Sequence, residues 1–341
     1  MAAYDFVFDN LGLRNWCGEK TGGSMNMADL LSKRSAETET SLWDLPFPSL
    51  DNLHDACPAI AQTRQLTSGL ESGFLGIKNT LTFVIDPVTQ PLSWMLSGAL
   101  TTFQSTPWWI MIPALLAIVY IASKSLKLVG MVASFLLFLA FIDHYDYSMQ
   151  TLAIIFVCSV VCVLLGVPIG IAMSRSDRLQ RSLIPILDML QTLPPFVYLI
   201  PLIFLFSVTE PKLYGIAIIL YAIVPVIRLT DLGIRLVDKD VIEAANAFGM
   251  TKRQKLYGVQ IPLALPNIMA GVNQTIMMSL AMVVIASLVS APGLGVLVLR
   301  GIRNLELGVG LVAGLGIVLL AIMLDRVTKA ALARVNTSQQ Q

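Results

Sequence analysis

Long apolar runs dominate the chain from residue 107 onward, separated by polar stretches of varied length. A helix needs about 17–25 mainly apolar residues to cross the hydrocarbon core of a membrane. Segments of that length lie at 107–123, 126–142, 149–174, 183–207, 212–228, 264–290 and 309–328. The pattern therefore predicts an all-α integral membrane protein with about seven transmembrane helices.

Residues 1–86 have a different pattern, with scattered glycine, serine and threonine and no long apolar run. They carry eleven acidic and six basic residues, and Met1–Asn10 lacks the basic and apolar regions of a signal peptide. We expect a mostly irregular polar tail with some short helices. The next stretch, 87–106, is amphipathic and contains Trp94, which predicts a helix at the membrane interface.

These patterns divide the chain into parts of different character. The polar tail (1–86) and the interfacial helix (87–106) precede a pair of accessory membrane helices (107–146). A transmembrane domain then covers 147–330 and contains a long polar insert at 229–263, and residues 331–341 form a C-terminal tail.

The distribution of lysine and arginine predicts the orientation of the crossings. With the polar tail outside, the cytoplasmic stretches after residue 107 hold fourteen Lys and Arg residues and the outer stretches hold three. Positive residues concentrate on the cytoplasmic side of plasma-membrane proteins. We therefore expect an extracytoplasmic N-terminus, a cytoplasmic C-terminus and a cytoplasmic insert.

Composition narrows the class of protein. The chain is 55% hydrophobic and 13% charged, against about 25% charged in soluble domains, and a net charge of +1 gives no support for nucleic-acid binding. Cys17, Cys57, Cys158 and Cys162 form no C-x2-C pattern, which argues against a metal site. Cys158 and Cys162 fall in an apolar run and are expected to pack in a core.

The polar insert carries an ordered local pattern. Asp238 and Asp240 favour the start of a short helix over 238–249, and Gly249 can adopt the positive φ that ends it. A second helix is expected over 251–260, with Pro262 stopping it. An ordered helix–turn–helix outside the membrane is suited to dock against a partner.

The spacing in this insert resembles the EAA motif of permeases of binding-protein-dependent ABC importers. Stretches 185–206, 221–234, 261–289 and 293–302 are similar to the osmoprotectant branch, the permeases of glycine betaine/proline betaine importers. The resemblance covers about residues 90–330. Under it, the residues that couple to the ATPase are Glu243, Ala244, Ala245, Gly249, Val259, Ile261 and Pro262.

The resemblance implies an ABC importer type I permease fold in a homodimer in the cell inner membrane. Its partners would be two copies of a cytoplasmic ATP-binding subunit and an extracytoplasmic substrate-binding protein. The cargo would be glycine betaine or proline betaine, with choline, carnitine or trimethylamine N-oxide as alternatives. A basic loop that merely contacts anionic lipid is the alternative for the insert.

Motifs for catalysis are not evident. The stretch 12-GLRNWCGEKT-21 departs from the spacing of a Walker A motif, and no HExxH or paired-carboxylate pattern occurs. We expect a non-catalytic transport subunit that binds no cofactor, with ATP hydrolysed by the partner. The alternatives are an ion-coupled secondary transporter, in which inverted repeats are common, and an osmosensor scaffold that anchors an ATPase.

Polar residues inside the crossings are candidates for the substrate pathway. Pro194 and Pro195 predict a break in the fourth crossing, and broken helices at membrane depth often line a cavity. Asp188 could instead lie near the cytoplasmic interface and pair with an arginine such as Arg181, and the amide side chains could simply join neighbouring helices. The candidates are Asp188, Gln191, Thr192, Tyr198, Asn273 and Gln274.

Two other features complete the pattern. Trp108 and Trp109 are expected to anchor the first crossing at the interface, because tryptophan favours that zone. No aromatic cage for a quaternary ammonium group is evident, so substrate selection is expected mainly in the binding protein. Small residues that suit close helix packing or a dimer seam are Gly308, Gly310, Gly314 and Gly316.

Overall fold

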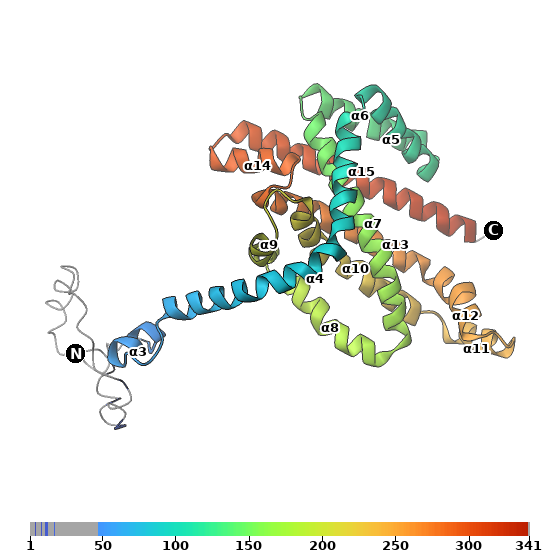
Figure 1. The fold of residues 1–341 in the computed structure, drawn as a ribbon. Coiled ribbons are helices and arrows are strands. Elements are labelled where there is room, and N and C mark those ends of the chain that lie inside the picture. Colours follow the sequence, from blue (N-terminus) through green and yellow to red (C-terminus); the bar gives the residue numbers. More distant parts are fainter. Residues whose placement is uncertain (1–3, 5–7, 9–10, 13–16, 18–46, 340–341) are drawn as a thin grey trace. The chain divides into compact units, whose positions relative to one another are not determined.

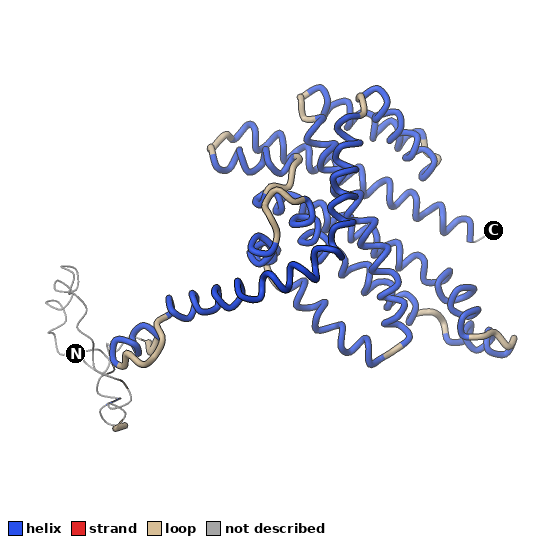
Figure 2. Tube along the Cα trace, in the orientation of Figure 1, coloured by secondary structure: helices blue, strands red, loops and turns tan. Residues whose placement is uncertain are grey.

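The computed structural model describes residues 4, 8, 11, 12, 17 and 47–339, with side chains up to residue 334. These residues form helices and loops and contain no strand (Figure 2). The chain divides into two compact units, Met1–Leu81 and Thr82–Gln341. The all-α prediction is confirmed, while most of the Walker-like stretch 12–21 lies outside the described residues.

The first unit contains a short helix held by a disulfide. Helix α3 (Leu50–Ala56) begins at Ser49, whose hydroxyl accepts a hydrogen bond from the Asn52 amide. Cys17 and Cys57 form a disulfide and pack with neighbouring apolar side chains. Sequence analysis did not pair these cysteines, although two cysteines in a tail expected outside the cytoplasm are a signal for such a bond.

A long helix, α4 (Thr63–Ser105), replaces the irregular structure expected before residue 87. That expectation is wrong from Thr63 onward, because apolar residues recur there every three or four positions. Further along α4, the segment predicted to lie at the interface packs through Leu96, which is fully buried against the core of the second unit. Trp94 remains exposed on the opposite side.

Helices α5 (Trp108–Ser123) and α6 (Leu126–Phe141) form a hairpin. Lys124 turns the chain between them in the left-handed conformation, with φ 50°. Leu136 and Leu139 of α6 are buried in a core shared with α5, α7 and α15. Trp108 and Trp109 at the start of the hairpin are exposed, as side chains at an interface would be.

Three helices form the centre of the second unit (Figure 1). Helix α10 (Pro211–Arg235) packs along its length against α7 (Tyr145–Arg175) and α13 (Ile261–Ala286). Small buried residues allow this close approach. As expected, Cys158 and Cys162 are free thiols buried in these cores.

The predicted break at the two prolines is present. Helix α8 (Asp177–Thr192) ends before them, and the 3-10 turn η2 (Pro195–Tyr198) leads into α9 (Leu199–Leu205). The two parts are bent by 104°. Proline cannot donate the backbone hydrogen bond that would continue α8.

The polar insert forms α11 (Lys239–Ala247), α12 (Lys252–Lys255) and the π turn η3 (Leu256–Gln260). The π turn leads without interruption into α13, so the expectation that Pro262 stops the second helix is wrong. Pro262 follows the π turn as the second residue of α13, and its missing N–H removes one backbone donor without ending the helix. Residues Lys252–Val289 therefore form one continuous helical span.

The chain ends with a second hairpin. The 3-10 turn η4 (Ser287–Val289) leads into α14 (Leu294–Arg303), and α15 (Leu307–Gln339) returns beside it. A Cβ built on Gly301 of α14 would lie 2.6 Å from the Cα of Gly310 in α15. The two backbones thus approach as closely as glycine permits.

The number of crossings is lower than seven by the stricter test of single long helices. In the described residues, four helices are long and apolar enough to cross a membrane, or up to six if each bent pair counts as one span. The bent pairs are α4 with α5 and α8 with α9, and α6 is a shorter apolar helix. Each predicted segment thus corresponds to a helix or, for 183–207, to the bent pair α8 with α9. The helices of the first two segments are too short to count as crossings alone.

Candidate functional site

The helix–turn–helix of the insert begins as its sequence predicts. Asp238 precedes α11, and its carboxylate accepts a hydrogen bond of 2.9 Å from the Asp240 amide. Figure 1 shows α11 and α12 extending beyond the ends of α10 and α13. The helix expected over 238–249 is confirmed to within two residues at its end.

The turn after α11 is closed by backbone hydrogen bonds. The Gly249 amide donates to Asn246 O and the Met250 amide donates to Ala245 O, the pairing of a Schellman helix end. Gly249 has φ 71°, as expected, and a Cβ there would meet nothing within 4 Å. Phe248 is 86% exposed beside it. The turn presents an apolar tip that sequence analysis did not single out.

Helix α12 is fixed to α11 through polar contacts. Thr251 and Gln254 form a reciprocal capping box at its start. The Lys255 ammonium donates a hydrogen bond of 2.9 Å to Asn246 Oδ1 of α11. These contacts make the two short helices one ordered unit, although four residues alone could not form a stable helix.

The EAA residues occupy different environments around this unit. Glu243 and Ala244 are exposed, whereas Ala245 is buried. The remaining members, Val259, Ile261 and Pro262, are half-buried in η3 and the first turn of α13. A groove of about 390 Å³ lies beside the motif, lined by Ser174, Ile234, Arg235, Val237, Lys239, Ile242, Glu243, Asn246 and Gln260.

Arg235 ties together the helices at the edge of this groove. Its guanidinium donates to Asp231 at 2.9 Å, to Asp177 at 2.7 Å and to Met173 O at 2.9 Å. Gln180 of α8 also donates to Asp231, at 2.7 Å. Three helices, α7, α8 and α10, are thereby held at the base of the insert, a network that sequence analysis missed because its members are far apart in the chain.

Asp188 pairs with an arginine other than the one proposed from sequence. Its carboxylate accepts a hydrogen bond from Arg228 of α10, while the Nε of Arg181 donates to Asp177 O. Pairing with an arginine is confirmed, but the partner is Arg228 and not the example Arg181, because the rotation of α8 presents Asp188 to α10. Both members of the pair are partly exposed, at 52% for Asp188 and 39% for Arg228.

The other candidates in the broken crossing lie near its break. Gln191 is one turn beyond Asp188 on α8, and its amide approaches the sulfur of Met278 at 3.9 Å. Thr192 donates to Met189 O at 3.3 Å. Tyr198, beyond the prolines, is buried and donates back to Leu190 O. Asp188 and Gln191 thus share one face of α8, whereas the hydroxyl of Tyr198 is used to close the break.

The candidates in α13 face different ways. The Asn273 amide donates to Asp325 at 3.2 Å and its oxygen accepts from Thr328, both of α15. Asp325 also pairs with Lys329 at 2.8 Å. Gln274 is exposed on another face of α13. The structure therefore joins Asn273 to α15 and does not bring it together with Asp188.

This architecture is that of a known protein family. Residues 162–337 match the family described as "Binding-protein-dependent transport system inner membrane component". The chain belongs to this family. The match includes the broken helix, the insert with its EAA residues and both hairpin helices at the C-terminal end.

Relatives of this transport component extend the match to most of the chain. It is 39% identical over 293 residues to the glycine betaine/proline betaine transport system permease protein ProW of Escherichia coli, covering 85% of this chain and 81% of that protein. It is 40% identical over 258 residues to the glycine betaine transport system permease protein OpuAB of Bacillus subtilis, covering 75% and 86%.

A solved structure shares the fold. The MetNI methionine ABC transporter, in an inward-facing conformation, superposes with a TM-score of 0.51 at 19% identity, covering 56% of this chain and 95% of that one. At this identity the likeness concerns the fold alone. The family assignment therefore rests on the family match and on the two relatives.

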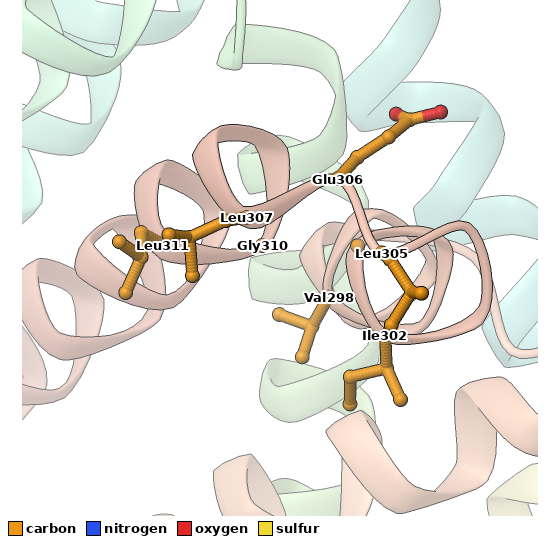
Figure 3. Close-up of a pocket in the computed structure, with 8 residues that line it drawn as sticks. Val298, Ile302, Leu305, Glu306, Leu307, Gly310 and Leu311 are labelled. Carbon is orange, nitrogen blue, oxygen red and sulfur yellow. The ribbon is translucent and has the colours of Figure 1, made fainter.

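Two features of this transport component lie away from the insert. An apolar hollow of about 440 Å³ opens between α14 and α15, where the labelled side chains of Val298, Ile302 and Leu311 lie and Glu306 points away (Figure 3). Lys212, at the start of α10, has a side chain only 5% exposed, paired with Asp86 at 2.8 Å.

Proposed function

We propose that this chain is the membrane-spanning permease subunit of an ATP-driven importer for glycine betaine, proline betaine or a related quaternary amine. The observation that carries the proposal is the ordered α11–turn–α12 unit with its exposed tip, on a chain of this family. The cargo class follows from the two relatives, ProW and OpuAB, each at least 39% identical over most of the chain.

The ordered insert suits a partner that delivers force. Two copies of a cytoplasmic ATPase would dock on Phe248 and Gly249, and their ATP-driven closure would move α11 and α12. Since η3 and α13 continue α12 without a break, that movement passes into the bundle. A loaded substrate-binding protein would dock outside, and reciprocity of coupling predicts that it stimulates ATP hydrolysis from there.

A homodimer of this chain in the lipid membrane completes the proposal. Gly310 and Gly316 already contact atoms of their own chain, whereas Cβ atoms built on Gly308 and Gly314 would meet nothing within 4 Å. The latter two are therefore the better candidates for a seam with a second copy. Substrate would pass near Asp188, Gln191 and Thr192.

The proposed location is the cell inner membrane, with the N-terminus outside and the C-terminus in the cytoplasm. The bias of Lys and Arg toward the inner stretches supports this orientation. The disulfide between Cys17 and Cys57 supports it independently, because such bonds persist in oxidising compartments. Both observations support a tail on the side of the binding protein.

This subunit would not itself hydrolyse ATP or need a cofactor. Its contribution is to bind, orient and release the cargo. Choline, carnitine and trimethylamine N-oxide are the alternative cargoes, and a secondary transporter or an ATPase-anchoring scaffold are the alternative functions. All of these alternatives give distinct results in one reconstitution.

The experiment uses liposomes that contain this chain and its ATPase, with the loaded binding protein outside. ATP hydrolysis and uptake of labelled glycine betaine, proline betaine, choline, carnitine and trimethylamine N-oxide, each in turn, are measured together for the wild type, Gly249→Asp and Gly249→Asn. Asparagine and aspartate both tolerate the left-handed conformation, so the pair isolates the added charge from backbone strain. We expect Gly249→Asp to lose both activities and Gly249→Asn to keep more of each.

The remaining outcomes decide among the alternatives. Uptake that proceeds without ATP would identify a secondary transporter. Hydrolysis without uptake of any of the five cargoes would identify a scaffold. Equal loss in Gly249→Asp and Gly249→Asn would mean that the turn's geometry, and not a contact with the ATPase, limits coupling.

A further inference from the structure

The pair Asp188–Arg228 joins α8 to α10 near the inner ends of the crossings predicted at 183–207 and 212–228. Arg228 precedes the inner end of α10 at Arg235 by seven residues, about 10 Å along the helix at 1.5 Å per residue. Asp188 precedes the end of α8 at Thr192 by four residues, about 6 Å from the break. The pair is thus deeper than the Arg235 network at the base of the insert.

Exposure at this depth requires a polar surrounding. Asp188 and Arg228 are each more than one third exposed in the single chain. Charged side chains in membrane segments avoid lipid and face a bundle interior or a water-filled cavity. In the permease proposed above, the inner part of the path across the membrane would supply such a surrounding.

The arginine has further capacity for a ligand. A guanidinium carries N–H donors in a planar fork that matches a carboxylate. Arg228 donates to Asp188 through Nη2, whereas its Nε is buried and has no hydrogen-bond partner among the described residues. Leaving a buried donor unpaired costs free energy, and an acceptor that reaches Nε when the ion pair opens would offset that cost.

We propose that Asp188 and Arg228 form a transient binding subsite for a zwitterionic cargo, a proposal that rests on the proposed function. Glycine betaine carries one carboxylate and one quaternary ammonium group. Its carboxylate would bind the Arg228 fork, and its ammonium, which has no N–H donor, would lie beside the Asp188 carboxylate.

Asp188 and Arg228 would exchange each other for the charges of the cargo, which suits the subsite to rapid passage of the cargo. The ion pair opens as the zwitterion enters and closes as it leaves, so each protein charge has an opposite charge in both states. A cation without a carboxylate would leave Arg228 unpaired, which disfavours it. Gln191, one turn along the same face of α8, extends the polar surface toward the break.

The test uses the reconstituted permease, ATPase and binding protein. The variants are Arg228→Gln, Asp188→Asn and the neutral pair Asp188→Asn with Arg228→Gln, which retains a hydrogen bond between α8 and α10. Lys329→Gln is the matched control, since it removes an exposed ion pair from α15. Glycine betaine uptake and hydrolysis stimulated by the binding protein are recorded together.

We expect the neutral pair to lower uptake at least tenfold while stimulated hydrolysis remains, and the control to stay within twofold of wild type. Uptake within twofold of wild type in the neutral pair would overturn the proposal, because the charges would then serve only to hold α8 against α10. Absence of ATP-dependent uptake in the wild type would instead refute the proposed function.

A binding measurement supplies a readout that packing alone would not move. Thermal unfolding of the purified permease–ATPase complex is followed with glycine betaine and with choline, without the binding protein. A ligand that binds the folded state raises the unfolding midpoint. We expect a larger shift with glycine betaine, and loss of that preference in Arg228→Gln. An unchanged preference in this variant would overturn the proposal.

Discussion

Lys212 of α10 and Asp86 of α4 form an ion pair of 2.8 Å across 126 residues of sequence, with the lysine side chain almost fully buried. The ammonium also lies 3.0 Å from Glu210 and over the ring of Phe206 at 5.1 Å. These contacts connect α4 to the start of the central helix. A buried cation is stable only while such partners are present.

Removal of Asp86 should therefore weaken the packing of α4 more than removal of the local partner. We expect Asp86→Asn to destabilise the protein by about 1–3 kcal/mol, the range for leaving a buried polar group poorly satisfied. Glu210→Gln should cost less, because it lies two residues from Lys212 and joins no other helix. Thermal unfolding in detergent measures both.

Combining Asp86→Asn with Lys212→Met tests the cause. The single change leaves the buried Lys212 charge poorly compensated, and removing that charge as well should recover most of the lost stability. A double variant less stable than either single change would show that the charges are not what joins these helices.

The contact between Gly301 and Gly310 predicts a second, purely steric effect. A Cβ on Gly301 would lie 2.6 Å from the Cα and 2.7 Å from the N of Gly310, and backbone atoms cannot rotate away. We expect Gly301→Ala to separate α14 from α15 and to cost about 1–3 kcal/mol, as overpacking does.

Gly308→Ala is the matched control for this steric effect, because its Cβ would meet no atom of this chain within 4 Å. It should leave the unfolding midpoint unchanged or slightly higher, since alanine favours helix. Reduced crosslinking between copies in Gly308→Ala would support the proposed seam. Equal destabilisation by the two substitutions would contradict the steric account.

The exposure of Phe248 predicts that the ATPase contacts the insert through this side chain. Its side chain is 86% exposed, so Phe248→Ala should not affect folding. Aromatic residues that fill a partner's pocket can contribute about 2 kcal/mol or more, which corresponds to roughly a thirtyfold loss of affinity. The affinity of the purified ATPase for the permease in nanodiscs measures this loss.

Phe141 at the end of α6 is also 86% exposed and provides the control. Phe141→Ala should bind the ATPase as the wild type does, because the hairpin is not part of the insert. If Phe248→Ala bound equally well, docking would have to depend on other parts of α11 and α12.

The disulfide between Cys17 and Cys57 predicts how the cysteines of the tail react with a thiol reagent in intact cells. A membrane-impermeant maleimide should label Cys17 and Cys57 only after an impermeant reductant is added, while Cys158 and Cys162 stay buried and unlabelled. Labelling is read as a gel shift, with Cys17→Ser as the variant that frees one thiol. Labelling that requires permeabilised cells would place the tail in the cytoplasm and refute the proposed orientation.

Local signals explain what the sequence could predict. Asp238 starts α11 and Gly249 ends it, each through hydrogen bonds to residues close by in the chain. The break after Thr192 follows from two adjacent prolines. Long apolar runs similarly reveal the crossings. Each of these features depends on residues that are neighbours in the chain.

Features that depend on helix rotation were not predictable in the same way. Asp188 meets Arg228, forty residues away, and not Arg181 on its own helix. Pro262 was expected to end a helix but lies inside a continuous one, since the π turn before it carries the helix onward. The disulfide between Cys17 and Cys57 depends on how the tail folds back.

The uninterrupted span Lys252–Val289 links the insert to the far end of the bundle through one helix. At 1.5 Å per residue, its 38 residues extend about 57 Å, from α12 in the insert to Val289 at the other end. There the chain turns at Ser290, whose hydroxyl binds Val208 O in the loop before α10. Under the proposed function, nucleotide on the inside and a docked protein on the outside would therefore act on the same continuous helix.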